Sequence, residues 1–374
     1  MSLRVLVTGG AGFIGSHIVD ALVARGYRVR VLDNLDPQVH GPARTKPSYL
    51  NPRAEFIEGS VLNYAELKEA IRGMNVICHQ AAAVGVGQSM YEIRHYVEVN
   101  TMGAANLLHI IANEEHDIER TLVASSMSIY GEGKYLCDEC GVQFPELRPL
   151  SQLMKHEWEM KCPQCGRDMK PLSCDEFKPL HPTSIYAITK RDHEEMFLTV
   201  GRAYDIPTIA LRYFNTYGPR QALSNPYTGV GAIFSARLLN DEPPLIFEDG
   251  HQCRDFIHVS DIVQANILAL ENGQMEYGTF NIGTGRRTSV LAVARILSEK
   301  LRKDIEPQVL YQFREGDIRH CFAEISRAKE ELGFEPRVDL EDGLGDLVDW
   351  VRHEMTRDSV EVANEELLAR GLIK

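Results

Sequence analysis

The sequence predicts an α/β fold in which a parallel sheet is covered by helices on both faces. Short apolar runs rich in β-branched residues alternate with amphipathic stretches of helical length, which is the pattern of such a sheet. The chain has 374 residues, which is long for one hydrophobic core. We therefore expect one large domain and a smaller one.

Six strands are expected in the first 215 residues, and helices connect them. The expected strands cover residues 4–8, 28–33, 55–58, 75–79, 120–125 and 208–213. The expected helices of this half cover residues 16–25, 64–72, 99–113 and 186–204. The active cleft should then lie at the carboxyl ends of the strands.

After about residue 215 the pattern becomes irregular, and helices are expected over residues 231–239, 260–271 and 290–301. We assign residues 1–215 to the sheet domain, which contains an insertion over 134–178. Residues 216–374 are assigned mainly to a smaller α/β domain that binds the substrate, with part of this chain able to return to the sheet.

Composition excludes several classes of function. The formal charge is −13, from 40 basic and 53 acidic side chains, which disfavours nucleic acid and anionic membranes as partners. No run of about 18 apolar residues predicts a membrane span. The first ten residues, MSLRVLVTGG, run into strand-like sequence without a secretory leader, so we expect a cytoplasmic protein.

The first expected strand is followed by a glycine-rich turn, VLVTGGAGFIG. Gly9 suits a tight turn, Gly12 lets the backbone approach a pyrophosphate, and Gly15 permits close packing of helix on strand. The following helix N-terminus attracts the anion. A glycine triplet alone is also typical of a plain connecting turn, but the strand before it and the helix after it favour a dinucleotide site.

Asp33 ends the second expected strand, 18 residues after Gly15. Its carboxylate suits the ribose hydroxyls of adenosine and would repel a 2′-phosphate, so NAD is favoured over NADP. The alternative is that Asp33 merely begins a turn with Asn34.

Tyr186 and Lys190 are four residues apart on an expected helix, which places them on one face. A tyrosine has a pKa of about 10, and lowering it to about 7 requires about 4 kcal/mol. One cation at about 4 Å supplies that energy at an effective dielectric of about 20, and Lys190 could provide it. The pair therefore suits acid–base catalysis on a hydroxyl, although Tyr-x-x-x-Lys also occurs by chance.

Four segments together resemble the extended short-chain dehydrogenase/reductase family, in its NAD-dependent nucleotide-sugar epimerase/dehydratase branch: GGAGFIG at 9–15, Ser125-Ser126, Tyr186-x-x-x-Lys190 and NTYGPR at 215–220. The resemblance implies a Rossmann fold and assigns Ser126, Tyr186 and Lys190 to catalysis. It assigns NAD binding to Gly9, Gly12, Phe13, Ile14, Gly15, Asp33, Asn34, Ser60, Val61, Ala81, Asn100, Tyr186 and Lys190.

The same resemblance implies which residues bind a nucleotide-diphosphate sugar. Asn215, Arg254, Arg314 and Asp317 would hold the diphosphate and ribose, and guanidinium groups suit phosphates geometrically. Ser89 and Ser126 would lie at the sugar. One departure is Ser60, which stands where relatives usually place an Asp near the adenine.

The reaction expected is 4-epimerisation by transient oxidation at C4. Dehydratases and decarboxylases of the family add acidic residues just after the catalytic Ser or Thr, whereas Met127 and Ser128 follow Ser126 here. The alternatives are a ketoreductase or a decarboxylase on the same scaffold. A further alternative is an NAD-binding regulator without enzymatic activity.

The insertion carries two C-x-x-C pairs, Cys137 with Cys140 and Cys162 with Cys165. Four thiolates satisfy a closed tetrahedral zinc site, which predicts an inserted zinc ribbon of structural role. Unmetallated turns or a redox couple are the alternatives. Residues 137–178 contain six Lys or Arg against eight Asp or Glu, which disfavours nucleic-acid binding.

The position of the insertion suggests a flap at the mouth of the sugar pocket that shapes substrate choice. An inserted ribbon at this place resembles a bacterial subgroup that includes dTDP-L-rhamnose 4-epimerases, which implies dTDP-L-rhamnose or another NDP-hexose as the substrate. The helices expected over 99–113 and 186–204 resemble those that pair into four-helix dimer interfaces in the family, so a homodimer is expected.

Overall fold

A computed structural model describes residues 3–222, 229–353 and 360–374. Its centre is a seven-stranded sheet in the order β14-β9-β5-β4-β1-β2-β3, and every neighbouring pair is parallel. The strands are β1 (Arg4–Thr8), β2 (Arg28–Asp33), β3 (Glu55–Glu58), β4 (Val76–His79), β5 (Arg120–Ser126), β9 (Thr208–Tyr213) and β14 (Tyr277–Ile282). The expected α/β class with a parallel sheet is confirmed.

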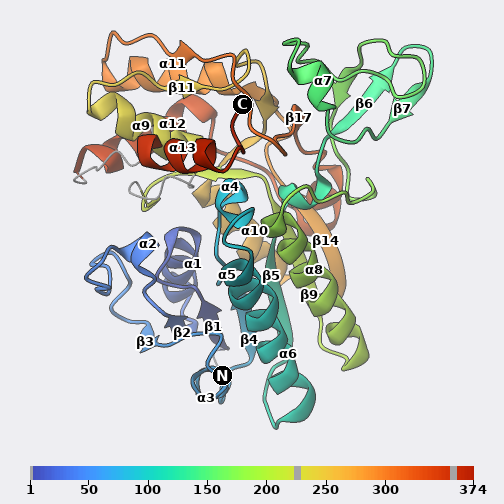
Figure 1. The fold of residues 1–374 in the computed structure, drawn as a ribbon. Helices are drawn as coiled ribbons and strands as arrows, with labels where there is room; N and C mark the ends of the chain where they lie inside the picture. The colour runs from blue at the N-terminus through green and yellow to red at the C-terminus, as the bar shows by residue number, and fades with distance from the viewer. Residues whose placement is uncertain (1–2, 223–228, 354–359) are drawn as a thin grey trace.

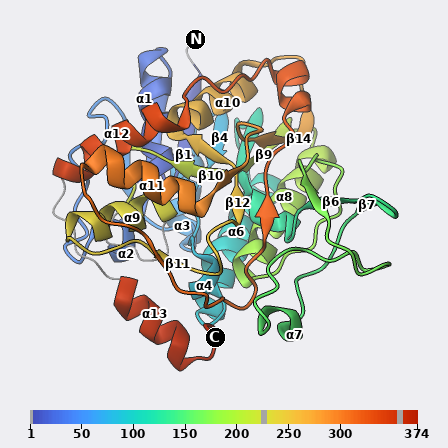
Figure 2. The same cartoon turned by 90° about the horizontal axis from the view of Figure 1, so that it is seen from above.

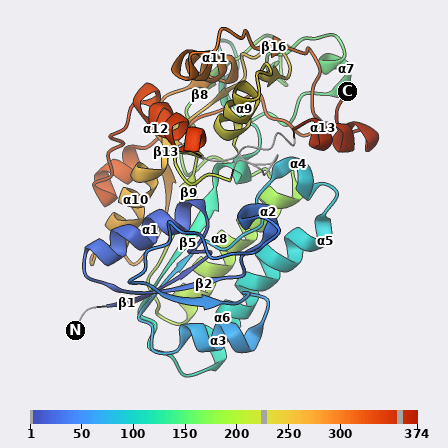
Figure 3. The same cartoon turned by 90° about the vertical axis from the view of Figure 1, so that its left-hand side faces the viewer.

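Helices cover both faces of this sheet (Figure 3). Alternate residues of a strand point to opposite faces, so Val5 and Val7 of β1 join one core and Leu6 joins the other. One face carries α1 (Phe13–Ala24) and α10 (Val259–Glu271). The other face carries α3 (Tyr64–Ile71), α6 (Gly103–Asn113) and α8 (Ile185–Ala203). This double cover explains why the strands are apolar on both sides.

The C-terminal part stands above the carboxyl ends of the strands (Figure 1). Its helices are α9 (Val230–Leu239), α11 (Val290–Leu301), α12 (Leu340–His353) and α13 (Val360–Ala369). Its short strands are β10 (Asn215–Tyr217), β11 (Leu245–Ile246), β12 (Cys253–Arg254), β13 (Phe256–His258), β15 (Thr288–Ser289), β16 (Gln308–Val309) and β17 (His320–Cys321). α9, α11 and α12 enclose a separate apolar core that includes Phe234, Leu297 and Leu347.

The chain returns from this part to the sheet domain. The irregular sequence pattern after residue 215 did not show where this return occurs. Residues 259–282 form α10, which packs on α1, and then β14, which extends the sheet beyond β9. The remaining short elements are α2 (Pro37–His40), α4 (Val86–Ser89), α5 (Ile93–Tyr96), η1 (Val97–Met102), η2 (Met127–Tyr130) and η3 (Ala328–Leu332). Within the described ranges, none of the helices combines the length and apolar character needed to cross a bilayer.

The insertion forms a small antiparallel sheet in the order β7-β6-β8. Its elements are β6 (Lys134–Cys137), β7 (Gly141–Gln143), α7 (Leu150–Leu153) and β8 (Lys170–Leu172). Tyr135, Met160 and Met169 pack with the cysteines into a core of its own. Seen from above, the insertion lies at the rim, with β12 and β17 between it and α9 and α11 (Figure 2).

Candidate functional site

A cavity of about 670 Å³ lies between the carboxyl ends of the strands and the C-terminal part. Most residues expected at the site line its wall: Gly9, Gly12, Phe13, Ile14, Gly15, Asp33, Asn34, Ser60, Val61, Ala81, Ser126, Tyr186, Lys190, Asn215, Arg254, Arg314 and Asp317. Ser89 and Asn100 lie off the wall. The strand order reverses between β4 and β1, so the cavity lies where open α/β sheets bind ligands.

Two glycines of the turn have no room for a side chain. Gly9 has φ of +68°, and a Cβ there would stand 2.8 Å from the backbone of Ala81. A Cβ on Gly15 would stand 2.2 Å from the carbonyl oxygen of Gly9. Helix α1 begins after Gly12, and no side chain caps it. A helix N-terminus at the cavity wall that no side chain caps fits a pyrophosphate.

Asp33 lies at the end of β2, and its carboxylate is held toward this turn. It accepts hydrogen bonds from the backbone N–H groups of Ala11 at 3.0 Å and Leu35 at 2.9 Å. His40 Nε2 lies 3.6 Å from the same carboxylate. A fixed acidic group here suits ribose hydroxyls and opposes a 2′-phosphate, so the residues present fit NAD.

Ser89 and Asn100 are fully buried behind the wall. Asn100 accepts from the backbone of Ala83 at 2.8 Å and donates to Thr189 Oγ1 at 2.9 Å, which ties the loop after β4 to α8. The Ser89 hydroxyl donates to the carbonyl of Val86 at 2.7 Å. Both side chains therefore support the cavity wall from behind.

Ser126 ends β5, and Tyr186 lies in the first turn of α8, so two neighbouring elements bring them together. Ser184 caps this helix by accepting from the backbone of Ala187 at 3.1 Å. Glu194, further along α8, accepts from Ser125 Oγ at 2.7 Å and from Arg212 of β9 at 2.9 Å. These buried bonds fix the position of α8 against both strands.

Burial controls the titration of the catalytic pair. It raises the pKa of Tyr186, and a hydrogen bond with Ser126 acts in the opposite direction. Burial also lowers the pKa of Lys190 to about 7. The expected lowering of the Tyr186 pKa by Lys190 is therefore not seen here, because desolvation dominates both groups.

Lys190 has a neutral partner that the motif did not predict. Its Nζ lies 3.3 Å from His193 Nδ1, while His193 Nε2 lies 2.8 Å from the carbonyl oxygen of Asn100. A carbonyl only accepts, so Nε2 carries the proton and Nδ1 accepts from the lysine. Burial and Lys190 hold the pKa of His193 well below its usual range, which keeps the ring neutral.

The opposite wall of the cavity carries the groups expected to bind phosphate. Arg314 donates to Asp317 at 2.9 Å and stacks over the ring of Phe247 at 4.7 Å. Arg254 donates to the carbonyl of Ile318 at 2.7 Å. Within the described chain, Asn215 Oδ1 is buried without a hydrogen-bond partner, so it can accept from a ligand.

Two wall residues were missed by sequence reasoning. Ser128 was noted only because it is not acidic, but its hydroxyl donates to Ser126 Oγ at 2.8 Å. Its place in SSMSIYG was the available signal. Glu248 also lines the cavity, and nothing in its local sequence marks it.

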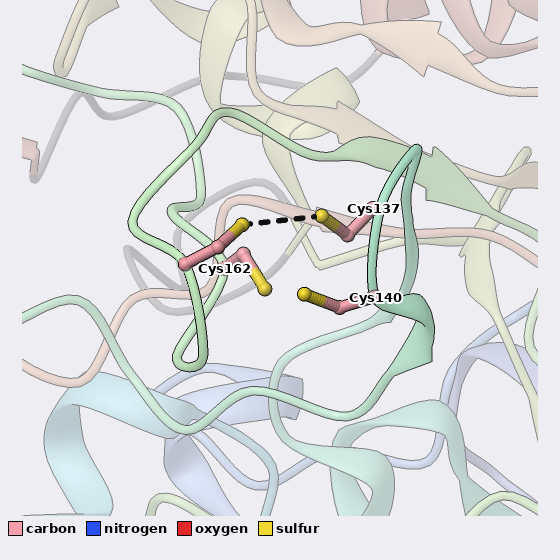
Figure 4. Close-up of side chains that lie close together, drawn as sticks. Cys137, Cys140 and Cys162 are labelled. Carbon is pink, nitrogen blue, oxygen red and sulfur yellow. Dashed lines mark hydrogen bonds between the residues drawn. The ribbon is translucent and has the colours of Figure 1, made fainter.

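The four cysteines of the insertion converge, with their sulfur atoms all within 4.8 Å of one another. Cys137 and Cys165 Sγ are 3.5 Å apart. Figure 4 shows the side chains of Cys137, Cys140 and Cys162 directed toward a common point. Four sulfurs at 2.3 Å from a zinc ion would lie about 3.8 Å apart, so the cluster fits a structural zinc site.

Comparison with known proteins agrees with this geometry. The profile of the NAD dependent epimerase/dehydratase family matches residues 5–152, and that of GDP-mannose 4,6 dehydratase matches residues 166–347. A dTDP-L-rhamnose 4-epimerase from Burkholderia thailandensis is 36% identical over 95% of this chain and 96% of its own. A putative UDP-glucose 4-epimerase from Methanocaldococcus jannaschii is 33% identical over 93% of this chain and 98% of its own.

Solved structures give the same result. A UDP-glucose 4-epimerase from Thermotoga maritima, crystallised with UDP-glucose, matches with a TM-score of 0.76 and 34% identity, covering 94% of this chain and 99% of that one. The expected family is confirmed. The chain belongs to the NAD-dependent nucleotide-sugar epimerase/dehydratase family of extended short-chain dehydrogenases/reductases.

Proposed function

We propose that this chain is an isomerase, an NAD-dependent nucleotide-sugar 4-epimerase. The observation that carries the proposal is the meeting of Ser126 and Tyr186 on the wall of a cavity that also holds the glycine turn and the arginines. Met127 and Ser128 follow Ser126 and carry no carboxyl group for dehydration or decarboxylation. Oxidation and reduction at one carbon need only these side chains together with bound NAD.

The glycine turn and Asp33 would hold the pyrophosphate and adenosine ribose of NAD. The chemistry that NAD supplies when bound is acceptance and return of a hydride, together with a positive charge on its oxidised ring. Ser60 and Val61 line the adjoining wall. Lys190 would lie between Tyr186 and the cofactor. His193 accepts one hydrogen bond from its ammonium group and so fixes its orientation.

Tyr186 and Ser126 would handle the proton. With NAD bound, Tyr186 as the phenolate would take the proton of the 4-hydroxyl while the C4 hydride leaves to the nicotinamide, and it would return the proton when the same hydride comes back to the other face of the ketone. Ser126, oriented by Ser128, holds the sugar oxygen beside the phenol. Each cycle returns every proton and hydride to the sugar, so no net oxidation occurs.

Asn215, Arg254 and Arg314, with Asp317, would bind the nucleoside diphosphate. The relative from Burkholderia thailandensis makes dTDP-L-rhamnose the first substrate to test. The test incubates purified protein with dTDP-L-rhamnose, UDP-glucose, UDP-N-acetylglucosamine and UDP-glucuronate. We expect a 4-epimer without net change in NADH. Stoichiometric NAD(P)H consumption would indicate a ketoreductase, release of carbon dioxide a decarboxylase, and inertness a binding protein.

We further propose that the four cysteines bind one structural Zn²⁺ and that the chain forms a homodimer in the cytoplasm. The convergence of the thiols supports the first. Exposed apolar side chains on neighbouring helices, Ile93, Val97, Met102 and Ile188, support a dimer surface. Metal analysis and light scattering of the purified protein test these two points.

A further inference from the structure

The insertion does not reach the cavity as a flap. Among the described residues, none of 134–178 belongs to the cavity wall. The insertion instead touches the back of that wall through two charged side chains. Arg148, in the loop after β7, and Glu159, ahead of the second cysteine pair, provide these contacts.

Arg148 is buried and forms an ion pair with Glu248 of the cavity wall. Its side chain is 1% exposed, and its two terminal nitrogens donate to the two oxygens of Glu248 at 2.9 and 2.7 Å. It also donates to the carbonyls of Trp158 at 2.9 Å and Asp317 at 3.3 Å. Arg148 therefore links the insertion to two segments that line the cavity.

Arg319 lies on the other side of Glu248 and is completely buried. All five of its N–H donors have carboxylate acceptors, supplied by Glu159, Glu248 and Asp249 at 2.6–3.1 Å. One of the three carboxylates belongs to the insertion. The guanidinium thus joins the insertion to the segment 247–249 of the C-terminal part.

The backbone around Arg319 positions Arg254, a candidate phosphate-binding residue. Arg254 donates to the carbonyl of Arg319 at 3.0 Å and to that of Ile318 at 2.7 Å. Glu132 accepts from the backbone N–H groups of Arg319 at 2.7 Å and His320 at 3.0 Å. A shift of residues 317–320 would therefore move the guanidinium of Arg254.

We propose that Arg148 and Glu159 are positioning residues for the nucleoside-diphosphate end of the cavity. They hold Glu248 and Arg319, which fix the backbone that orients Arg254. Arg148 also neutralises a buried carboxylate on the wall that would otherwise repel a diphosphate. This inference rests on the proposed function, because it assumes that a nucleoside diphosphate binds there.

The decisive experiment measures the dissociation constants of dTDP, UDP and NAD by calorimetry. Arg148→Met should weaken dTDP or UDP binding at least tenfold and leave NAD binding within twofold. The KM for the sugar nucleotide should rise by a similar factor, with kcat changed less than threefold. Arg148→Lys keeps the positive charge but loses the two parallel hydrogen bonds of the guanidinium. Its nucleotide affinity should lie between those of the parent and Arg148→Met.

Two further variants separate the charge effect from loss of packing. Arg148→Met combined with Glu248→Gln removes both charges and should recover part of the lost nucleotide affinity. Glu159→Gln leaves Arg319 with two carboxylates, so it should fold and weaken nucleotide binding about threefold. If Arg148→Met fails to fold, Glu159→Gln tests the inference in its place.

Arg167→Met is the matched control, because Arg167 forms an exposed ion pair with Glu139 in the same insertion. Its nucleotide affinity should equal that of the parent. Unchanged affinity in folded Arg148→Met and Glu159→Gln would overturn the inference, as would equal losses of NAD and nucleotide affinity. A parent protein that binds neither dTDP nor UDP would instead overturn the proposed function.

Discussion

Two groups of buried cations flank the cavity, and they are stabilised in opposite ways. Lys190 lies beside a neutral imidazole, and no carboxylate is among its contacts in the described chain. Arg148 is paired with the carboxylate of Glu248, and Arg319 is paired with those of Glu159, Glu248 and Asp249. The lysine can therefore change charge near neutral pH, whereas the guanidiniums stay charged. A catalytic site needs the first property and a binding wall the second.

The largest effect on turnover should come from Tyr186, which belongs to the same catalytic site as Lys190. Tyr186→Phe removes the hydroxyl that carries the proton and should lower kcat about 10³-fold, while NAD still binds. Tyr204→Phe, in an exposed residue at the end of the same helix, should match the parent. Comparable turnover in the Tyr186 variant would refute the assigned chemistry.

Lys190 is predicted to make stability depend on pH. Its pKa is about 7 in the folded protein and about 10.4 when unfolded, so the unfolded state binds more protons between these values. The free energy of unfolding therefore rises with pH over that window. Lys190→Met should flatten this rise in thermal melts of protein stripped of NAD and lower kcat about 10²-fold.

Arg191→Met is the control for that slope, since Arg191 lies on the exposed side of α8 in a pair with Glu195. Its pH dependence should follow the parent. A slope that survives in Lys190→Met would assign the titration to another group.

Loss of the proposed zinc site should affect the nucleotide-binding wall near Arg148 and Arg319 more than the catalytic site around Lys190. Cys162→Ser should abolish stoichiometric zinc and lower the melting temperature, because metal binding orders the insertion. Nucleotide affinity should fall, while NAD affinity stays close to that of the parent. Cys78→Ala, a buried thiol of β4 outside the cluster, should keep its zinc. Full metal content in Cys162→Ser would contradict the four-thiolate site.

The smallest effect is expected at His193. His193→Leu removes the acceptor for one lysine hydrogen, which disfavours the ammonium. The pH profile of kcat should shift, with a loss of about fivefold, the scale of one hydrogen bond. A uniform loss at every pH would point to packing instead.

The strands and the glycine turn were predictable because each depends on a local pattern. The expected ranges 4–8, 28–33, 55–58 and 208–213 agree with the structure to the residue. Tyr186 and Lys190 were also visible, because their spacing alone places them on one helical face.

The rest depends on contacts between distant segments. Arg148 and Glu248 are 100 residues apart, and no periodicity in either loop announces their pairing. The raised pKa of Tyr186 follows from burial, which a motif does not reveal. Asn100 could be associated with the site by resemblance, but only packing shows that it faces Thr189 behind the wall.

Strand β14 has a consequence for any attempt to divide this protein. It pairs with β9 along six residue positions, and α10 covers the sheet beside it, yet both follow the C-terminal excursion in the chain. A fragment ending near residue 215 would expose the hydrogen-bonding edge of β9 and a bare apolar face, which favours aggregation. Exchanging specificity between relatives therefore calls for grafting loops into the whole chain, since a cut at that point yields no autonomous half.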